Sequence, residues 1–189
     1  MQGPLKPIFS GPFFFAFKAC RAIRIVIICP PVQYRLNDNG NYYYAGVDVK
    51  SKGVEAEVTG RINEYVDLEF GFTALKLEDE QDADIYLWVP RRTVNLALSS
   101  KLPGVPQLEV GLNGKWQSDI STIDGYTNGE VRQDSYALLG AFVRWDATEH
   151  TTVRFNANNL TDEKYITSLY QVGFYGAPAN YSLTFGYDF

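Results

Sequence analysis

Apolar and polar side chains alternate strictly in segment after segment of this chain, from about residue 41 to its last residue. Residues 65–77 show it clearly, because Val66, Leu68, Phe70 and Phe72 alternate with Asp67, Glu69, Gly71 and Thr73. A period of two places each kind of side chain on its own face of an extended strand. The same pattern runs through residues 93–102, 107–118, 151–158 and 181–189. The chain is therefore predicted to be all-β, with one apolar and one polar face.

Two segments do not follow the simple alternation. Residues 135–145 are apolar on both faces, so their orientation in the sheet stays open. Within residues 42–60, Val47 and Val49 stand at odd positions, whereas Val54 and Val58 stand at even ones. A single strand can carry this phase slip if a β-bulge lies near Lys52 and Gly53.

The connections between the predicted strands alternate between short and long. Residues 61–64, 102–106 and 146–150 read as short turns, and residues 78–91, 119–133 and 171–179 as long polar loops. In an up-and-down antiparallel sheet, short turns gather at one end and long loops at the other. This is the layout of a bacterial outer-membrane barrel, and most segments have the length that a membrane-crossing strand needs. A soluble β-sandwich, which also alternates, is the alternative.

The charge and the N-terminal segment narrow the interpretation further. A net charge of −5 without a clustered cationic face argues against nucleic acid as a partner. Residues 1–40 are predicted to be poorly organised: Arg21 and Arg24 interrupt the apolar run, which matches neither a signal peptide nor a membrane-spanning helix. This segment either does not belong to the fold of the rest or supplies an extra strand at residues 21–28. Whether Cys20 and Cys29 form a disulfide stays open.

No catalytic constellation is present in the sequence. His150 is the sole histidine, and beside Glu149 in a short turn it is expected to be solvated. There is no nucleophile elbow, phosphate loop or metal-ligand spacing, so we expect no enzyme activity, cofactor or metal site. The acidic run of residues 78–84 offers hard oxygen ligands for a divalent cation. A solvated, mobile loop is the preferred interpretation, because runs of like charge repel and extend.

Four stretches carry a family resemblance. They are SKGVEAEVTGRINEYVDLEFGFTAL (residues 51–75), VPRRTVNLAL (89–98), FNANNLTDEKYITS (155–168) and GFYGAPANYSLTFGYDF (173–189). In this order they resemble the C-terminal end of TonB-dependent outer-membrane siderophore receptors. The third resembles the family's Asn-Leu-Phe-Asp-x-x-Tyr signature, with Thr161 in place of Phe, and the fourth its closing hairpin with a terminal Phe. Ala179 departs from the Arg that ferric-siderophore members commonly carry after Gly-x-Pro.

The resemblance implies a 22-stranded barrel filled by an N-terminal plug domain. About seven C-terminal strands are recognisable in residues 41–189, and no stretch resembles the plug or the TonB-binding segment. We therefore expect a fragment of a receptor for energy-dependent ferric siderophore uptake that does not transport alone. The intact relative takes ferric siderophore and TonB as partners, and this chain is expected to meet outer-membrane lipid and the barrel-assembly machinery. The alternatives are a small stand-alone outer-membrane barrel and a soluble carbohydrate-binding β-sandwich.

Aromatic residues near the long loops are the candidate ligand contacts. They could stack on an iron chelate, or they could form the aromatic girdle at the membrane surface. The candidates are Tyr86, Trp88, Trp116, Tyr126, Tyr170, Phe174 and Tyr175. At the other end, Tyr187 and Phe189 resemble the C-terminal signal that the barrel-assembly machinery recognises. Alternatively, Phe189 anchors the last strand at the periplasmic lipid boundary.

Overall fold

The computed structural model describes residues 32–36, 39–46, 49–125, 127–170 and 172–189. Within these ranges the chain forms strands and turns but no helix, and hence no helix suited to crossing a membrane. Tyr126, Cys20, Cys29 and the alternative strand at residues 21–28 lie outside the described residues.

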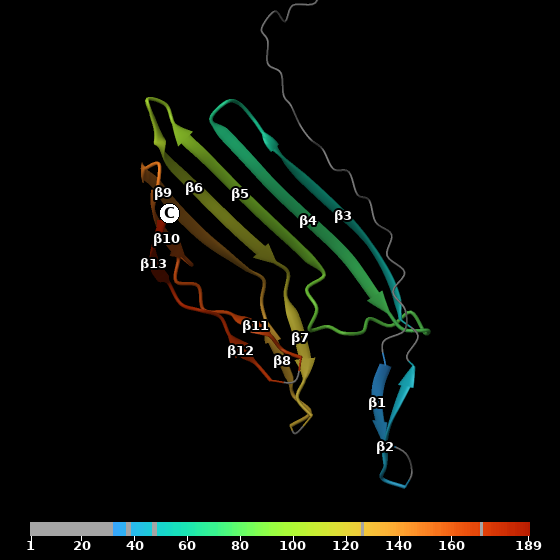
Figure 1. Ribbon diagram of the computed structural model, residues 1–189. Helices are drawn as coiled ribbons and strands as arrows, with labels where there is room; N and C mark the ends of the chain where they lie inside the picture. Colours follow the sequence, from blue (N-terminus) through green and yellow to red (C-terminus); the bar gives the residue numbers. More distant parts are fainter. Residues whose placement is uncertain (1–31, 37–38, 47–48, 126, 171) are drawn as a thin grey trace, which may run out of the picture.

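Seven strands form one antiparallel sheet in which each strand pairs with its neighbours along the chain (Figure 1). The order β13-β10-β9-β6-β5-β4-β3 leaves β3 and β13 as the edges. The predicted up-and-down sheet is confirmed, and the described strands do not form the two packed sheets of a sandwich. The strands are β3 (Lys50–Arg61), β4 (Val66–Glu78), β5 (Arg92–Leu102), β6 (Val105–Gln117), β9 (Tyr136–Thr148), β10 (Thr151–Asn158) and β13 (Asn180–Tyr187).

The short turns gather at one end of this sheet and the long connections at the other, as predicted (Figure 1). Pro103 and Gly104 join β5 to β6, and the φ of Gly104, 82°, is one that residues with a Cβ rarely adopt. In the β3–β4 turn, Asn63 Oδ1 accepts hydrogen bonds from the backbone N–H groups of Tyr65 and Val66. The N–H of Asp188 donates to the carbonyl of His150 at 2.9 Å, so the last strand ends beside the β9–β10 turn.

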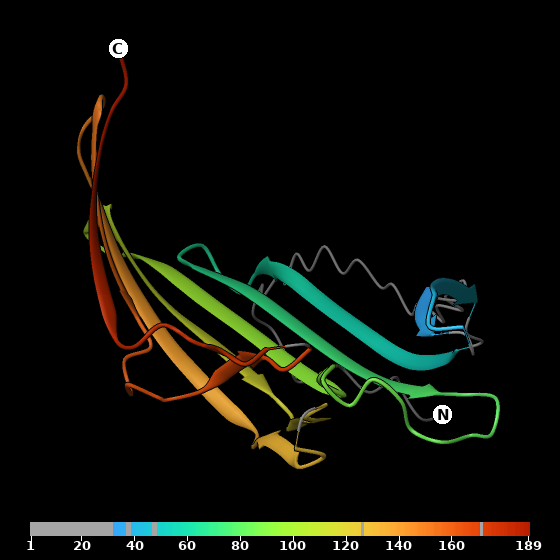
Figure 2. The same ribbon diagram turned by 90° about the horizontal axis from the view of Figure 1, so that it is seen from below.

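The pairing register sorts side chains into two faces. Val58, Phe70, Leu96, Gly114 and Leu139 form one cross-strand row, and Glu57, Gly71, Asn95, Lys115 and Leu138 form the next. The open question of residues 135–145 is thereby answered, because Leu139, Val143 and Trp145 share the apolar face of the neighbouring strands. The sheet curves into an open trough (Figure 2), and its cavity lies on the polar, concave face.

Apolar side chains on the opposite, convex face have little cover from the described chain. Leu112, Leu183 and Phe185 expose 54%, 72% and 69% of their surface. Among the described residues, the buried apolar side chains are those of Leu77, Ile120, Tyr136, Ala157 and Leu169. An apolar surface of this extent is typical of a face that meets lipid or another protein.

The start of the sheet differs from the prediction. Residues 50–61 pair with β4 without a register shift, so the expected β-bulge at Lys52 and Gly53 is wrong. The phase slip is accommodated by ending one strand and starting another. Residues 42–46 form β2 (Tyr42–Gly46), which pairs with β1 (Val32–Leu36) in a separate hairpin. This hairpin includes strands on both sides of residue 40, where the predicted poorly organised segment ends. The division of the chain into residues 1–40 and 41–189 stays a prediction.

Two further hairpins lie inside the long connections, where no strand was predicted. Between β6 and β9, β7 (Ile120–Ile123) pairs with β8 (Glu130–Gln133). Between β10 and β13, β11 (Ile166–Ser168) pairs with β12 (Phe174–Tyr175). The long connections thus have secondary structure of their own.

Candidate functional site

The long connections contact one another at one end of the sheet, and we call residues 79–91, 118–125, 127–135, 159–170 and 172–179 the loop cap. The N–H of Ser121 donates to the carbonyl of Leu87 at 3.0 Å, linking the first connection to the second. The N–H of Ile166 donates to Gln133 Oε1 at 2.9 Å, linking the second to the third. Ile120 and Leu169 are each only 2% exposed. The loop cap therefore has a small core of its own.

Three of the predicted aromatic residues meet in the loop cap. The ring centroids of Tyr86 and Trp88 lie 5.0 Å apart, and those of Trp88 and Tyr170 lie 5.3 Å apart, both at an interplanar angle of 60°. These edge-to-face contacts are favourable beyond their buried area. Tyr86 has a φ of 54°, which is uncommon for a bulky residue. Tyr170 remains 60% exposed. This aromatic cluster joins two connections that are distant in the sequence and leaves much of the Tyr170 side chain exposed.

The other predicted contacts are placed differently. Phe174 and Tyr175 in β12 are 59% and 82% exposed. Trp116 pairs with Val94 and Ala137 across the sheet, which places it on the apolar face with Leu112. That face is opposite the one that carries the cavity. The structure thus groups Tyr86, Trp88 and Tyr170 and separates Trp116 from them.

Arg91 supports the first connection, although the sequence did not single it out as a site residue. Its Nη2 donates to the carbonyls of Ile85 and, at 3.5 Å, Leu77. Its backbone N–H donates to Ser118 Oγ at 3.0 Å. Burial lowers the pKa of the Arg91 guanidinium, and the charge of Asp84 opposes that shift. The sequence signal that could have identified Arg91 is the pair of arginines, Arg91 and Arg92, that follows Pro90 at the end of the connection.

The acidic run folds into a tight turn rather than an extended loop. Asp79 Oδ1 accepts hydrogen bonds from the N–H groups of Gln81 and Ala83, both at 2.9 Å. Glu78, only 5% exposed, pairs with Lys76, and Asp82 pairs with Lys50 at 2.7 Å. The hydrogen bond from Lys50 lowers the pKa of Asp82. The described residues hold no group of three or more His, Cys, Asp or Glu side chains suited to a metal ion.

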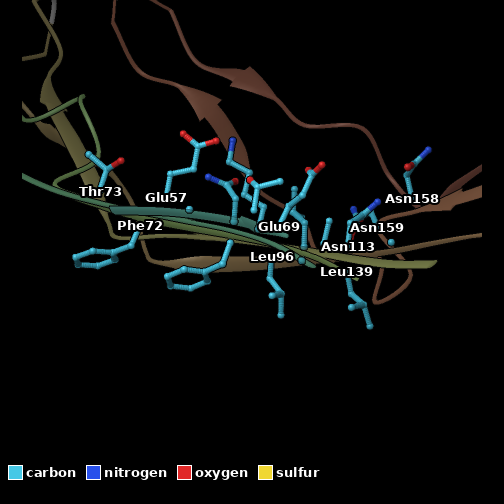
Figure 3. Close-up of a pocket in the computed structure, with 18 of the residues that line it drawn as sticks. Glu57, Glu69, Phe72, Thr73, Leu96, Asn113, Leu139, Asn158 and Asn159 are labelled. Carbon is cyan, nitrogen blue, oxygen red and sulfur yellow. The ribbon is translucent and has the colours of Figure 1, made fainter. Parts of the chain in front are cut away.

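A cavity of about 790 Å³ lies beneath the loop cap on the concave face. Glu57, Glu69 and Thr73 point into it, whereas Phe72 and Leu96 point away (Figure 3). His150 lies in the β9–β10 turn at the other end of the sheet, with its ring centroid 6.2 Å from that of Tyr187. The single histidine therefore has no part in the cavity.

Asn159, within the NNLTDEKY stretch, connects the end of β10 to the third connection. It is 5% exposed. Its Nδ2 donates to the carbonyls of Glu163 at 2.9 Å and Ala177 at 3.0 Å, and its Oδ1 accepts from the N–H of Glu163 at 2.9 Å. Asp162 Oδ1 accepts from the N–H of Ala179 at 2.9 Å. The stretch that carries the family signature thus fixes the path of the chain over the cavity.

Comparison with known proteins gives a consistent family. The family described as TonB dependent receptor-like, beta-barrel matches residues 27–160. The ferric-pyoverdine BN7/BN8 receptor of Pseudomonas putida is 31% identical over 150 residues, which are 79% of this chain and 18% of that protein. The ferripyoverdine receptor of Pseudomonas aeruginosa is 30% identical over 156 residues, 78% of this chain and 19% of that protein. The chain therefore spans less than a quarter of the length of these relatives.

Solved structures show the same fold. The crystal structure of the Pseudomonas aeruginosa ferripyoverdine receptor bound to ferripyoverdine matches with a TM-score of 0.75 at 24% identity, covering 85% of this chain and 23% of that one. The ferric-catecholate import receptor Fiu of Escherichia coli matches with a TM-score of 0.67 at 19% identity, covering 83% and 23%. The family match, the relatives and the antiparallel sheet agree, and the chain belongs to the TonB-dependent receptor β-barrel family of the bacterial outer membrane.

Proposed function

We propose that this chain forms part of the barrel wall and extracellular loops of a receptor for TonB-dependent uptake of a ferric siderophore. The aromatic cluster of Tyr86, Trp88 and Tyr170 is the observation that carries the proposal, because it presents rings at the long-loop end of a sheet from this family. The names of the relatives support ferric pyoverdine as the first ligand to test. The chain acts as a receptor and not as an enzyme.

The orientation in the membrane follows from the two faces. The convex face, with Leu112 and Phe185, contacts lipid, and the concave face lines the lumen. The loop cap is extracellular and the short turns are periplasmic. Tyr187 and Phe189, whose ring centroids lie 5.2 Å apart, are recognised by the barrel-assembly machinery. Tyr187 pairs with Thr151 on the apolar face, which suits contact with lipid at the periplasmic boundary.

The seven strands by themselves do not transport. In the described sheet, β3 and β13 are edges whose outer backbone groups lack a strand partner there. Unpaired backbone groups are strongly unfavourable in lipid. Because neighbouring strands alternate in direction, the first and the last of the seven, β3 and β13, run in the same direction. These two edges therefore cannot pair with each other as antiparallel strands. Transport requires further strands that join both edges.

Binding is tested on the whole chain in detergent micelles with ferric pyoverdine loaded with radioactive iron. We expect saturable binding that Trp88→Ala and Tyr170→Ala each weaken by about tenfold, because each removes a large contact surface. Trp145→Ala is the matched control, since Trp145 lies on the apolar face near the short-turn end. No binding by the unaltered chain, or equal loss in the control, would contradict the proposed site.

Transport is tested separately in iron-restricted cells that lack their own receptor for the same siderophore. The chain alone is expected to leave growth unchanged when ferric pyoverdine is the iron source. Growth restored by this chain alone would show that the seven strands suffice, and that part of the proposal would be wrong.

A further inference from the structure

Three Asn-Gly dipeptides occur in this chain, and the fold places two of them in very different surroundings. The three are Asn39–Gly40, Asn113–Gly114 and Asn128–Gly129. An asparagine that precedes glycine can react within itself, because the next backbone nitrogen can attack the side-chain amide and glycine has no Cβ to hinder the approach. The surroundings of each dipeptide decide whether the backbone can rotate into the reacting geometry.

Asn113 and Gly114 are held in the middle of the sheet. They lie in β6, which pairs with β5 on one side and with β9 on the other. Attack on the Asn113 side chain requires the backbone to rotate out of this ladder, and local opening of a paired strand costs free energy. The reaction at Asn113 is therefore expected to be slow.

Asn128 and Gly129 lie instead at the exposed tip of the β7–β8 hairpin. The two strands of this hairpin are four residues each and form a two-stranded sheet of their own. The backbone hydrogen bonds from Asn128 to Asp124 and from Asp124 to Gly129, both at 2.9 Å, stay within the tip. A hairpin of two short strands is only marginally stable. The backbone at Asn128 can therefore rotate without opening the large sheet.

A short chain of hydrogen bonds connects the Gly129 nitrogen to a carboxylate. The N–H of Gly129 donates to Thr127 Oγ1 at 3.3 Å, and Thr127 Oγ1 donates to Asp124 Oδ2 at 3.0 Å. The Asp124 carboxylate can accept the amide proton of Gly129 through the Thr127 hydroxyl group, which makes the nitrogen a better nucleophile. The tip thus holds a nucleophile, a proton relay and a base next to the amide of Asn128.

We propose that Asn128 is a site of self-catalysed deamidation. The Gly129 nitrogen attacks Asn128 Cγ and forms a cyclic imide. The bond between Cγ and Nδ2 breaks, and the proton that Gly129 gives up through Thr127 and Asp124 is replaced on the departing ammonia. Water then adds to either imide carbonyl and gives aspartate or isoaspartate. Both products add one negative charge to a hairpin that already carries Asp124 and Glu130, and this inference does not depend on siderophore binding.

The test follows deamidation in the whole chain, incubated in detergent micelles at neutral pH. Digestion and mass spectrometry measure the deamidated fraction at each asparagine, and chromatography separates the aspartate product from isoaspartate. We expect Asn128 to react at least about tenfold faster than Asn113, because only Asn113 must first leave the large sheet. In urea the two rates should become similar, since the sheet that protects Asn113 is lost. Equal rates in the folded chain, or no product at Asn128, would overturn the proposal.

Variants separate the relay from exposure alone. Thr127→Val removes the hydroxyl group and should slow the reaction at Asn128 by about tenfold, and Asp124→Ala should slow it likewise. In both variants the exposed Asn39 serves as an internal reference whose rate stays unchanged. Thr122→Val is the matched control, because Thr122 pairs with Val131 within the same hairpin but away from its tip. An unchanged rate in Thr127→Val, or an equal loss in Thr122→Val, would overturn the self-catalysed mechanism.

Discussion

At the scale of single residues, Asn159 makes the largest set of side-chain hydrogen bonds near the cavity. Its amide bonds Glu163 twice and Ala177 once, and its φ of 49° is one that asparagine tolerates better than most residues. Asn159→Ala removes these three part-buried hydrogen bonds. We expect a loss of about 2–4 kcal/mol in the free energy of unfolding, measured by urea denaturation in micelles.

The neighbouring residue supplies the control for this prediction. Asn158 is exposed and makes one side-chain hydrogen bond, to Asn180 Oδ1 at 3.0 Å. Asn158→Ala should cost less than about 1 kcal/mol. If both variants lose the same stability, the hydrogen bonds of Asn159 do not hold the third connection in place.

A pH dependence is expected at the Lys50–Asp82 ion pair in the first connection. The hydrogen bond from Lys50 lowers the pKa of Asp82 below its unfolded value of 3.8. The pair therefore stabilises the turn fully above that value and loses its effect as the pH falls through the lower, folded pKa. Carbon NMR of the Asp82 carboxyl group should show this depressed pKa.

Substitution of the lysine tests the cause of the shift. In Lys50→Gln the Asp82 pKa should rise toward its ordinary value, because the charged hydrogen bond is lost. Lys101→Gln, at the opposite end of the sheet near the β5–β6 turn, should leave it unchanged. A pKa of Asp82 that is the same in both variants would show that Lys50 is not responsible.

At the scale of elements, the third connection is fixed by the contact of Tyr165 with Gly176. The N–H of Gly176 donates to the Tyr165 carbonyl at 2.8 Å, and a Cβ added at Gly176 would lie 2.0 Å from the Tyr165 ring. The same ring lies 4.5 Å from that of Tyr136. Gly176→Ala should displace the Tyr165 ring, at a cost of about 1–3 kcal/mol, and raise proteolysis within residues 159–179.

Gly173 provides a matched site in the same connection. A Cβ added at Gly173 would come no closer than 3.7 Å to its neighbours, which is an ordinary contact. Gly173→Ala should therefore leave the rate of proteolysis nearly unchanged. Equal cleavage of both variants would mean that the Tyr165 ring does not anchor this segment.

Five of the seven sheet strands, β4, β5, β6, β10 and β13, could be predicted from the sequence because each repeats its alternation several times. Short strands carry no such signal: β7 and β8 are four residues each, and β11 and β12 are three and two. The orientation of β9 was open because its own faces are both apolar, and only pairing with β6 and β10 decides it. The prediction of a β-bulge was wrong because the same shift in the alternation also occurs where one strand ends and another begins.

The sequence could predict which residue types form the candidate site, but it could not predict how they are arranged in space. Tyr86, Trp88 and Tyr170 were among the predicted aromatic residues, but their contact joins separate connections. The alternation in residues 107–118 placed Trp116 on the same face as Leu112, and the pairing of β6 with β5 and β9 agrees with that prediction. The side chains of Arg91 and Asn159 donate hydrogen bonds to backbone carbonyls of other residues. Contacts of this kind leave no pattern in the sequence.

At the scale of the whole molecule, the two faces of the sheet differ in polarity. The convex face exposes large apolar residues, including Leu183 and Phe185, that the described chain does not cover. The concave face carries the charged and amide side chains that line the cavity. A wall of this kind is stable only where lipid contacts one face and polar groups contact the other. Proteins of this family lie in the outer membrane, where lipid is available to the convex face.

Adjacent residues of β6 give a direct test of this arrangement. Leu112, 54% exposed, lies on the convex face, and Asn113 lies on the concave face beside the cavity. In lipid vesicles, Leu112→Lys should lower the free energy of unfolding by about 2–4 kcal/mol, because it places a charge near the middle of the membrane. Asn113→Lys should change it by less than about 1 kcal/mol, since that face is polar. Urea denaturation of both variants measures the difference. Equal losses would show that the convex face does not contact lipid, and a larger loss for Asn113→Lys would reverse the assignment of the two faces.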